Sequence, residues 1–418
     1  MKSTLFNTVR ACGATTLALA LAACGGSGDG NGNGNGGTVT PPPPVVAQSI
    51  TLSGDATQVL PAGKPVALTA TLATPATVTW AISEGPGTLS ATTGANVTYT
   101  PPTAGVATAT QVVIKASAGD ASKTYRVTVY PEPGTPGLSL VAGLLNGTSA
   151  ADVDGTGAQA RFHQAVNLYK DAAGNIFVLE DPDERVTNNN ANGVAVRKIT
   201  PAGQVSTLVR GQAPHLHNGL TRPRSVIADA NGTVYFSMIQ ENAPLDHRSI
   251  CGAAIYKLGA NGAMTQFAGS GQESGYNQPT QPDGTGTAAG FCDASLAGFD
   301  GDGNLYAVDT VRIPDTSQNK ATYRKITPQG VVTTISALPD GITIGAPDGF
   351  QYVGLDHAIY RKAADGSQTL VAGVPGVNVN RPGPLPGSLD SPVTITPTGP
   401  ASFIVIANSA ILKLVLPH

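Results

Sequence analysis

Residues 196–203 read Val-Arg-Lys-Ile-Thr-Pro-Ala-Gly, a short β-type run with a lysine, followed by a turn that ends in glycine. The chain repeats this pattern. The lysine runs are Val196–Ile199, Ile255–Leu258, Tyr323–Ile326, Tyr360–Ala363 and Ile411–Leu414. The first four lead into turns ending at Gly203, Gly262, Gly330 and Gly366. A recurrence in units of about 56 residues indicates a repeat architecture rather than a single core.

Each lysine run is preceded by two further apolar runs, which a Gly- or Asn-containing turn joins into a hairpin. These turns lie at Asp171–Asn175, Asn231-Gly232, Asp302–Asn304, Asp348-Gly349 and Thr398-Gly399. Five four-stranded sheets result. The unused run Leu138–Gly143 is predicted to complete the last sheet and close the ring, as in β-propellers. We therefore predict a five-bladed β-propeller over residues 138–418, with six blades as the alternative.

Several stretches of the repeats resemble the NHL-repeat family. Asp154–Phe162 reads Asp-Gly-Thr-Gly-Ala-Gln-Ala-Arg-Phe, and Asp171–Val178 and Arg197–Gly203 complete the first copy. A partial second copy comprises Asp283–Gly286 and Asp302–Asp309. The resemblance implies an NHL-like propeller. Many members have six blades, which keeps the six-bladed alternative open.

Residues 46–131 show six short runs in which apolar and polar residues alternate, separated by Gly or Pro, as in a β-sandwich. The segment resembles bacterial Ig-like domains through Pro61–Gly63, Val78–Trp80, Gly87–Ser90 and Val97–Pro102. We expect Trp80 to be a core residue rather than a platform for sugars. The domain is interpreted as a spacer, and the whole protein is predicted to be all-β.

The first 23 residues have the features of a secretory signal peptide. Lys2 and Arg10 precede a short apolar stretch, and Leu21-Ala22-Ala23-Cys24 resembles the lipobox of bacterial lipoproteins. The resemblance implies lipidation of Cys24, and Gly25 after it favours the outer membrane. Residues 24–45 are rich in Gly, Asn and Pro, which predicts a flexible tether. We thus expect an exported, membrane-anchored lipoprotein of the cell envelope, without a transmembrane helix.

The charge balance argues against nucleic acid as a partner. The chain holds 24 Lys and Arg against 27 Asp and Glu, a net charge of −3, and only 12% of its residues are charged. Loss of the signal peptide removes Lys2 and Arg10 and makes the balance more acidic. Proteins that grip phosphate need a basic surface.

Propeller connectivity sends the short glycine turns to one face and the long connections to the other, which we call the long-loop face. The long connections are 144–164, 181–193, 211–224, 240–252, 270–294, 310–320 and 374–392. Binding residues concentrate on loops that a rigid scaffold presents. Cys251 and Cys292 lie in two of these connections and are predicted to form a disulfide in an oxidising compartment. Two free thiols or a metal pair are the alternatives.

Five histidines also fall on the long-loop face: His163, His215, His217, His247 and His357. Some propeller enzymes resembling this chain are metal-dependent lyases and lactonases, which would imply a cation held by such side chains. The weak candidate ligands are His163, His217, His247 and Asp181, with Glu180, Asp183 and Asp309 as further partners. Histidine favours loops in any case. No catalytic residue, cofactor or metal is therefore predicted, and a divalent metal belongs only to the enzymatic alternative.

Three other motifs are interpreted structurally. Asp300–Asn304 looks like the start of a calcium loop, but Arg312 stands where the ligating glutamate should be. Its place in the repeat favours a hairpin turn. The two Asp-Gly-Thr-Gly stretches match the aspartic protease signature but coincide with the NHL-like segments. The aligned lysines are expected to cover sheet surface with their stems.

These observations support three functional hypotheses. The leading one is a noncatalytic envelope lipoprotein whose propeller binds a protein or a glycan through the long-loop face. The alternative is a metal-dependent propeller lyase or hydrolase that acts near the propeller axis. A third hypothesis is a purely structural envelope component.

Overall fold

The computed structural model describes residues 48–106, 110–129, 134–149, 151–181, 193–212, 220–241, 251–271, 281–312, 318–339, 342, 346 and 350–417. Their regular elements are strands and short 3-10 helices, so the protein is all-β as predicted. Within these residues, no helix has the length and apolar character needed to cross a membrane.

The N-terminal strands form two four-stranded sheets that share one core. In sheet order, the first comprises β1 (Ile50–Gly54), β3 (Val66–Leu72), β6 (Asn96–Thr100) and β5 (Thr88–Leu89). The second comprises β2 (Gln58–Val59), β8 (Ala121–Val129), β7 (Thr110–Ala118) and β4 (Thr79–Glu84). Alternation along β3 buries Val66 and Leu68. Trp80 is also buried, and its indole N–H donates to the Gly94 carbonyl at 2.8 Å, which confirms its place in the core.

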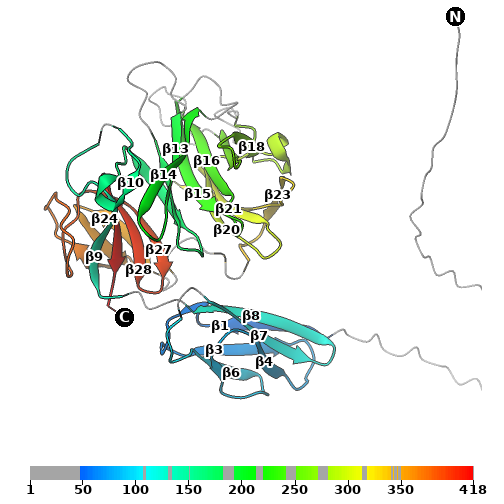
Figure 1. The fold of residues 1–418 in the computed structure, drawn as a ribbon. Coiled ribbons are helices and arrows are strands. Elements are labelled where there is room, and N and C mark those ends of the chain that lie inside the picture. The colour runs from blue at the N-terminus through cyan, green and yellow to red at the C-terminus, as the bar shows by residue number, and fades with distance from the viewer. Residues whose placement is uncertain are drawn as a thin grey trace, which may run out of the picture. The chain divides into compact units, whose positions relative to one another are not determined.

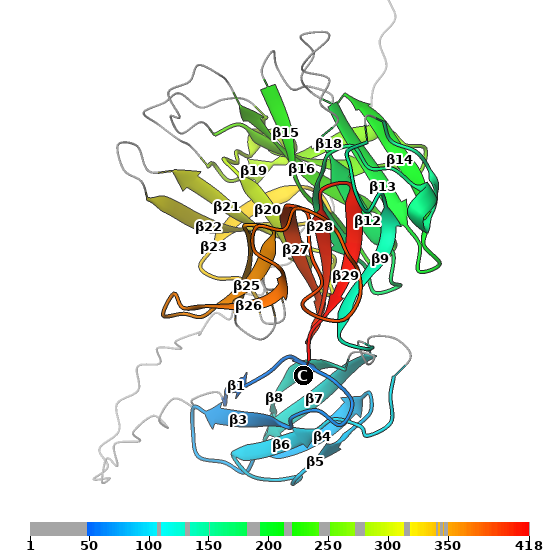
Figure 2. The ribbon, with the colours of Figure 1, turned by 90° about the vertical axis from the view of Figure 1, so that its left-hand side faces the viewer.

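The described residues between 137 and 415 form five further antiparallel sheets, sheets 1 to 5 (Figures 1 and 2). Sheet 1 comprises β10 (Gly155–Thr156), β14 (Gln204–Gln212), β13 (Gly193–Ile199), β12 (Ile176–Glu180) and β11 (Ala165–Lys170). Sheet 2 comprises β15 (Leu220–Ala228), β16 (Val234–Glu241), β17 (Ala253–Leu258) and β18 (Met264–Ala268). Sheet 3 comprises β19 (Gly284–Thr285), β23 (Val331–Ile335), β22 (Asn319–Ile326), β21 (Leu305–Arg312) and β20 (Ala294–Phe299).

Sheet 4 comprises β24 (Gln351–Leu355), β25 (Ala358–Lys362) and β26 (Gln368–Gly373). Sheet 5 comprises β27 (Pro392–Gly399), β28 (Ser402–Ala407), β29 (Ala410–Val415) and β9 (Gly137–Gly143). Strand β9 opens the repeat region and pairs with β29, the last strand of the chain. This pairing joins the two ends of the repeat region, as the sequence predicted. The succession of sheets fits a propeller.

The tight turns share one geometry. At Asp171–Asn175, the Asp171 N–H donates to the Asn175 carbonyl and the Gly174 N–H donates to the Asp171 carbonyl. Gly174 has φ 85°, a conformation that glycine adopts without steric cost. The same bonds recur in the turns of Gly203, Gly232, Gly262, Gly303, Gly330 and Gly366. Asp300 belongs to one of them, and its carboxylate accepts from the N–H groups of Asp302 and Asn304. This stretch is therefore a hairpin turn.

Sheets 1 and 3 each have an additional strand, contrary to the prediction of four. The Asp-Gly-Thr-Gly stretches supply β10 and β19, which pair with the outer strands β14 and β23. Connections 144–164 and 270–294 therefore do not lie wholly on the long-loop face. Their residues Gly155–Thr156 and Gly284–Thr285 run along the outer edge of a sheet, because that edge offers unpaired backbone groups.

Sheet 4 departs most from the predicted repeat. Only three of its strands lie in the described residues, and the expected turn at Asp348-Gly349 lies outside them. Ile359 belongs to the hydrophobic core that sheet 4 shares with Phe403 of sheet 5, the sheet that follows it. In the repeat alignment, the same side of the strand in sheet 1 carries Arg197, which instead faces Phe162 and sheet 5, the sheet that precedes sheet 1. Lys362 consequently lies on the face away from sheet 5. Lys362 is therefore not equivalent to the other four aligned lysines, contrary to the prediction, because a slip of one residue moves every side chain to the other face.

The hydrophobic core of the repeat region lies between neighbouring sheets. Phe162 and Ile404 belong to the core between sheets 5 and 1, and Phe177 and Phe236 to the core between sheets 1 and 2. Similar clusters join sheets 2 and 3 and sheets 4 and 5. Strands β24 and β27 approach so closely that a Cβ on Gly354 would lie 2.2 Å from the Pro392 carbonyl oxygen. Only glycine fits at this position.

Replacing Gly354 with alanine should therefore lower the free energy of unfolding by about 1–3 kcal/mol, since the clash is with backbone atoms that cannot rotate away. Urea denaturation followed by circular dichroism would measure the change. Gly301→Ala is the matched control, because its added Cβ would meet nothing within 4 Å. Equal effects of the two substitutions would contradict the close approach of β24 and β27.

Candidate functional site

The strand registers identify the long-loop end of sheet 1. Ala165 pairs with Glu180, Glu180 with Ala195, and Gly193 with Gln212. The connections after β12 and β14 therefore leave the sheet at one end, opposite the glycine turns. The residues that hold this end together form the candidate site.

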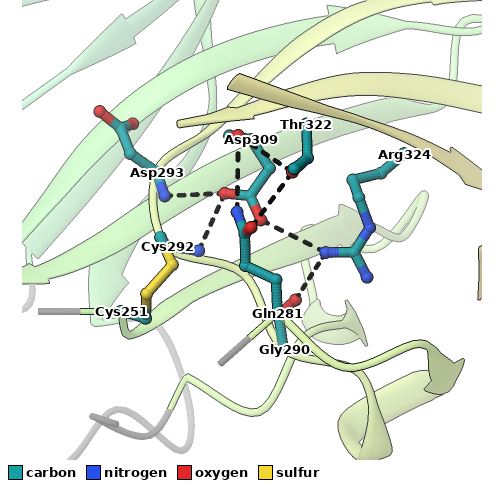
Figure 3. The surroundings of a disulfide bond; sticks show 8 residues. All are labelled: Cys251, Gln281, Gly290, Cys292, Asp293, Asp309, Thr322 and Arg324. Atoms are coloured by element: carbon teal, nitrogen blue, oxygen red, sulfur yellow. Dashed lines mark hydrogen bonds and ion pairs between the residues drawn. A yellow bond between two sulfur atoms is a disulfide. The ribbon is translucent and has the colours of Figure 1, made fainter. Parts of the chain in front are cut away.

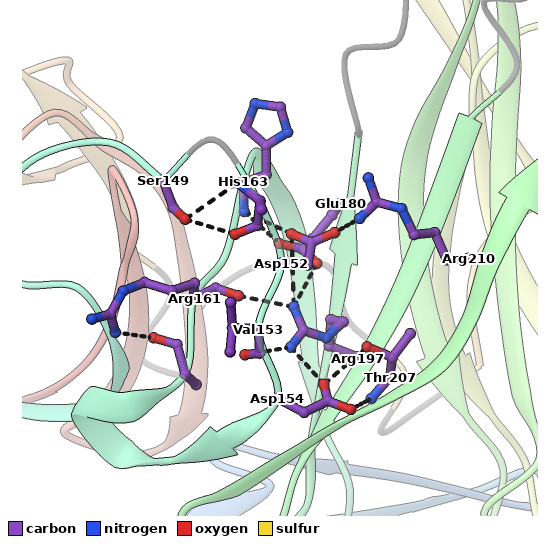
Figure 4. Close-up of polar contacts among 12 residues, drawn as sticks. Ser149, Asp152, Val153, Asp154, Arg161, His163, Glu180, Arg197, Thr207 and Arg210 are labelled. Atoms are coloured by element: carbon purple, nitrogen blue, oxygen red, sulfur yellow. Dashed lines mark hydrogen bonds and ion pairs between the residues drawn. The ribbon is translucent and has the colours of Figure 1, made fainter.

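A buried arginine organises this end of sheet 1 (Figure 4). Arg197 is fully buried on β13, and its Nη1 donates to the Arg161 carbonyl at 3.0 Å and to Glu180 Oε2 at 3.2 Å. Its Nη2 donates to the Val153 carbonyl at 3.0 Å and to Asp154 Oδ1 at 2.8 Å. One guanidinium thus ties the incoming connection to two neighbouring strands.

Sheet 3 contains the same arrangement around Arg324, which is also fully buried (Figure 3). Its guanidinium donates to the Gly290 carbonyl at 3.0 Å, Asp309 Oδ2 at 3.3 Å, the Pro282 carbonyl at 3.1 Å and Asp283 Oδ1 at 3.2 Å. Each guanidinium also lies over an aromatic ring, Phe162 in sheet 1 and Phe291 in sheet 3. We call the two sets the Arg197 cluster and the Arg324 cluster.

The aspartates of the Asp-Gly-Thr-Gly stretches have structural roles. Asp154 accepts hydrogen bonds from the Thr207 N–H and hydroxyl, and Asp283 accepts one from the Thr334 hydroxyl. Burial alone would raise the pKa of Asp154, but the bonds from Thr207 and Arg197 lower it below its ordinary value. The ionised carboxylates therefore anchor the connections, which agrees with the structural interpretation of this motif.

Two carboxylates that the sequence named as possible metal partners belong to these clusters. Glu180 is fully buried, and burial raises its pKa to about 6 although Arg197 and the His163 N–H favour the ionised form. Asp309 Oδ1 accepts from the N–H groups of Cys292 and Asp293 at 2.9 Å each, and burial raises its pKa as well. Both carboxylates thus already accept hydrogen bonds from an arginine and from backbone N–H groups.

The other candidate ligands do not converge in the described residues. The His163 N–H donates to Glu180 Oε1, but its imidazole points away from the carboxylates (Figure 4). The Asp181 N–H donates to the Gln164 carbonyl, and His357 Nδ1 accepts from the Ser391 N–H. Outside the described residues lie Cys24, Asp183, His215, His217 and His247. Among the described residues, no group of three His, Cys, Asp or Glu side chains could hold a metal ion.

Cys251 and Cys292 form a disulfide in the structure (Figure 3). Both cysteines are buried, and the bond ties the connection before β17 to the one that enters sheet 3. Cys292 also donates its N–H to Asp309, so the disulfide joins directly onto the Arg324 cluster. This pairing leaves neither free thiols nor a metal pair at these positions.

The sequence analysis missed Arg197 and Arg324 as organising residues. Both precede an aligned lysine, in Arg197-Lys198-Ile199 and Arg324-Lys325-Ile326. The repeated Arg-Lys-Ile, each downstream of an Asp-Gly-Thr-Gly stretch, is the signal that could have found them. Two further ion pairs lie at this end: Arg210 with Asp152, and Arg224 with Asp293.

No family model matches the chain, and no curated protein does. Similar solved structures include a protein of unknown function from Bacteroides thetaiotaomicron, 16% identical over 90% of this chain and 99% of that one, with a TM-score of 0.40. An α-L-arabinanase from Penicillium chrysogenum, complexed with arabinobiose, is 11% identical over 88% of this chain and 92% of its own, with a TM-score of 0.26. These similarities are too low to transfer a function.

Replacing Arg324 with leucine should lower the free energy of unfolding by about 3–5 kcal/mol, because Asp309 would remain buried without its counter-charge. Differential scanning calorimetry would measure the loss. The control is Arg210→Leu, whose side chain is 41% exposed and whose ion pair should contribute about 1 kcal/mol or less. A loss for Arg324→Leu no larger than that of the control would contradict the role of the cluster.

Replacing Glu180 with glutamine should alter how stability depends on pH. Burial raises the pKa of Glu180 from 4.5 to about 6 in the folded protein. Protonation of Glu180 therefore contributes to the stability of the fold in full below pH 4.5, and this contribution is lost as the pH rises to 6. The stability of the variant relative to the unmodified protein should therefore rise across this interval. Urea denaturation at several pH values would show it. Asp365→Asn, which removes a carboxylate with a lowered pKa, should not reproduce this rise.

Proposed function

We propose that the protein is a noncatalytic lipoprotein of the cell envelope, whose propeller binds a protein or a glycan through the long-loop face. The observation that carries this proposal is the pair of arginine clusters. They fix the connections at the base of the long-loop face, and their carboxylates are bound by arginine and backbone N–H groups of the protein itself. A rigid base beneath long connections is the usual design of a binding surface.

The finer assignment of the fold belongs to the same proposal. Five sheets, the pairing of β9 with β29 and the two copies of the NHL-like segment support a five-bladed NHL-like propeller, and the additional strands β10 and β19 do not require a sixth blade. The two N-terminal sheets around the Trp80 core support an Ig-like sandwich that acts as a spacer.

The anchor and the location complete the proposal and rest on the sequence. Lipid on Cys24 would attach the protein to the outer membrane, and residues 24–45 would form the tether. The disulfide between Cys251 and Cys292 favours an oxidising compartment outside the cytoplasm. The acidic balance of the chain makes a protein or a glycan a better partner than nucleic acid.

A pull-down from envelope extracts tests the binding face. The full chain should capture its partner, and a variant in which short Gly-Ser linkers replace residues 182–192 and 242–250 should lose at least about 90% of the capture, since these connections would form the contact surface. Substitution of residues 229–231, in a turn at the opposite end, should leave capture unchanged. Equal capture by all three proteins would refute the face assignment.

Metal analysis addresses the enzymatic alternative with the same preparations. Protein purified without added cation should contain no stoichiometric divalent metal, and His163→Ala, His217→Ala and His247→Ala should not alter its metal content. Stoichiometric metal that these substitutions remove would overturn the noncatalytic assignment and favour the lyase or hydrolase.

A further inference from the structure

Asp390 is a nearly buried carboxylate at the long-loop end of sheet 5. It lies on the connection from sheet 4, just before the inner strand β27, and is 9% exposed. Its Oδ2 accepts a hydrogen bond from Asn408 Nδ2 at 2.8 Å. In the part of the chain that the structure describes, Oδ1 has no hydrogen-bond partner, yet it is not sealed from solvent. This oxygen can therefore accept from a group outside the protein.

Asp390 lacks the counter-charge that the two arginine clusters supply to their carboxylates. Glu180 forms an ion pair with Arg197, and Asp309 forms one with Arg324. Among the described residues, no lysine, arginine or histidine forms an ion pair with Asp390. A carboxylate withdrawn from water is normally compensated by a cation. Asp390 therefore has the environment of an ion-paired carboxylate without the guanidinium.

The two turns beside Asp390 hold its surroundings in place without adding a positive charge. Ser391 donates its N–H to Nδ1 of His357 in the β24–β25 turn at 3.2 Å, and Asn408 lies in the β28–β29 turn. An imidazole that accepts at Nδ1 is neutral. His357, Ser391 and Asn408 have positive φ values of 62°, 47° and 55°, a backbone conformation that concentrates at ligand sites when residues other than glycine adopt it. The geometry around the carboxylate is thus fixed in the free protein.

A cation fits this carboxylate better than a sugar does. The hydroxyl groups of a sugar could donate to Oδ1, but they would leave the buried charge uncompensated. Small-molecule sites also use aromatic side chains, and no Phe, Tyr or Trp among the described residues is exposed. The chain has a net charge of −3, which attracts basic partners. These observations favour a protein ligand over a glycan.

We propose that Asp390 anchors an arginine side chain of a protein partner, whose guanidinium enters from the long-loop face and donates to Oδ1. Arginine suits the place because its guanidinium is weakly hydrated and is favoured in buried and interfacial ion pairs. The contact would repeat between two molecules what Glu180 and Arg197 do within this one. This inference rests on the proposed function and narrows its partner to a protein with an accessible arginine.

Peptide selection on the full chain in detergent tests the pairing. The probe is a phage library of random heptapeptides, and the enriched peptides should share an arginine. In a synthetic copy of such a peptide, citrulline should replace that arginine at the cost of an at least about tenfold higher dissociation constant, because it has a similar shape but no charge. Asp390→Asn should weaken binding of the arginine peptide by a similar factor and leave the citrulline peptide unaffected. Fluorescence anisotropy would measure all four combinations.

The matched control is Asp365→Asn, which removes an exposed carboxylate in a glycine turn at the opposite end and should leave every affinity unchanged. Asp390→Asn keeps the size of the side chain and an oxygen for Asn408, and circular dichroism would verify its fold. The proposal fails if arginine is not enriched, if the citrulline peptide binds equally well, or if Asp390→Asn leaves the affinity of the arginine peptide unchanged.

Binding to a glycan array that Asp390→Asn abolishes would also overturn the proposal, because the carboxylate would then serve a sugar. The pull-down with replaced connections distinguishes these failures from a failure of the proposed function. Capture that depends on the long connections but not on Asp390 would refute the arginine contact alone.

Discussion

The buried guanidinium groups of Arg197 and Arg324 are the constraint on which the repeat region depends. A charge placed in a protein interior is tolerated only when hydrogen bonds and a counter-charge replace its hydration. The two Nη atoms of each guanidinium meet this condition by donating to two backbone carbonyls and two carboxylates, whereas the buried Nε of each has no hydrogen-bond partner among the described residues. Both carbonyls and one carboxylate of each cluster belong to the incoming connection, and the other carboxylate belongs to a strand, β12 or β21. Compensating the buried charge therefore also fixes the path of the chain.

The same device explains why sheets 1 and 3 differ from sheets 2 and 4. In sheet 2 the buried Tyr256 stands in the place of the arginine, and among the described residues no additional strand pairs with the outer strand β18. In sheet 4 the register is shifted, and within the described ranges no additional strand pairs with β26. The Cys251–Cys292 disulfide adds a covalent tie to the sheet 3 connection, where sheet 1 uses hydrogen bonds from Leu144 and Ser149 to Ser409. The interactions that hold the connections thus differ from sheet to sheet, whereas the arrangement of the strands repeats.

For the candidate site, the sequence named two of the carboxylates but missed the arginines that contact them. Glu180 and Asp309 were named as possible metal partners because carboxylates beside histidines fit a cation. In the structure both face arginine instead, and sequence separation hid this, since Arg197 lies 17 residues from Glu180 and Arg324 lies 15 from Asp309. The cysteine pair was easier to predict, because only two cysteines remain once the expected signal peptide and Cys24 are set aside.

The sequence by itself determined the all-β class, the recurring hairpins with their glycine turns, and the joining of β9 to the last strand. These features follow from local rules, namely alternation, positive φ at glycine and a repeated spacing, which a single sequence displays directly. Only the tertiary structure decided that the Asp-Gly-Thr-Gly stretches form outer strands, that two arginines organise the long-loop end, and that the register of sheet 4 is shifted by one residue. These outcomes depend on which buried charges and apolar faces meet across the fold, and such contacts join residues that no local pattern connects.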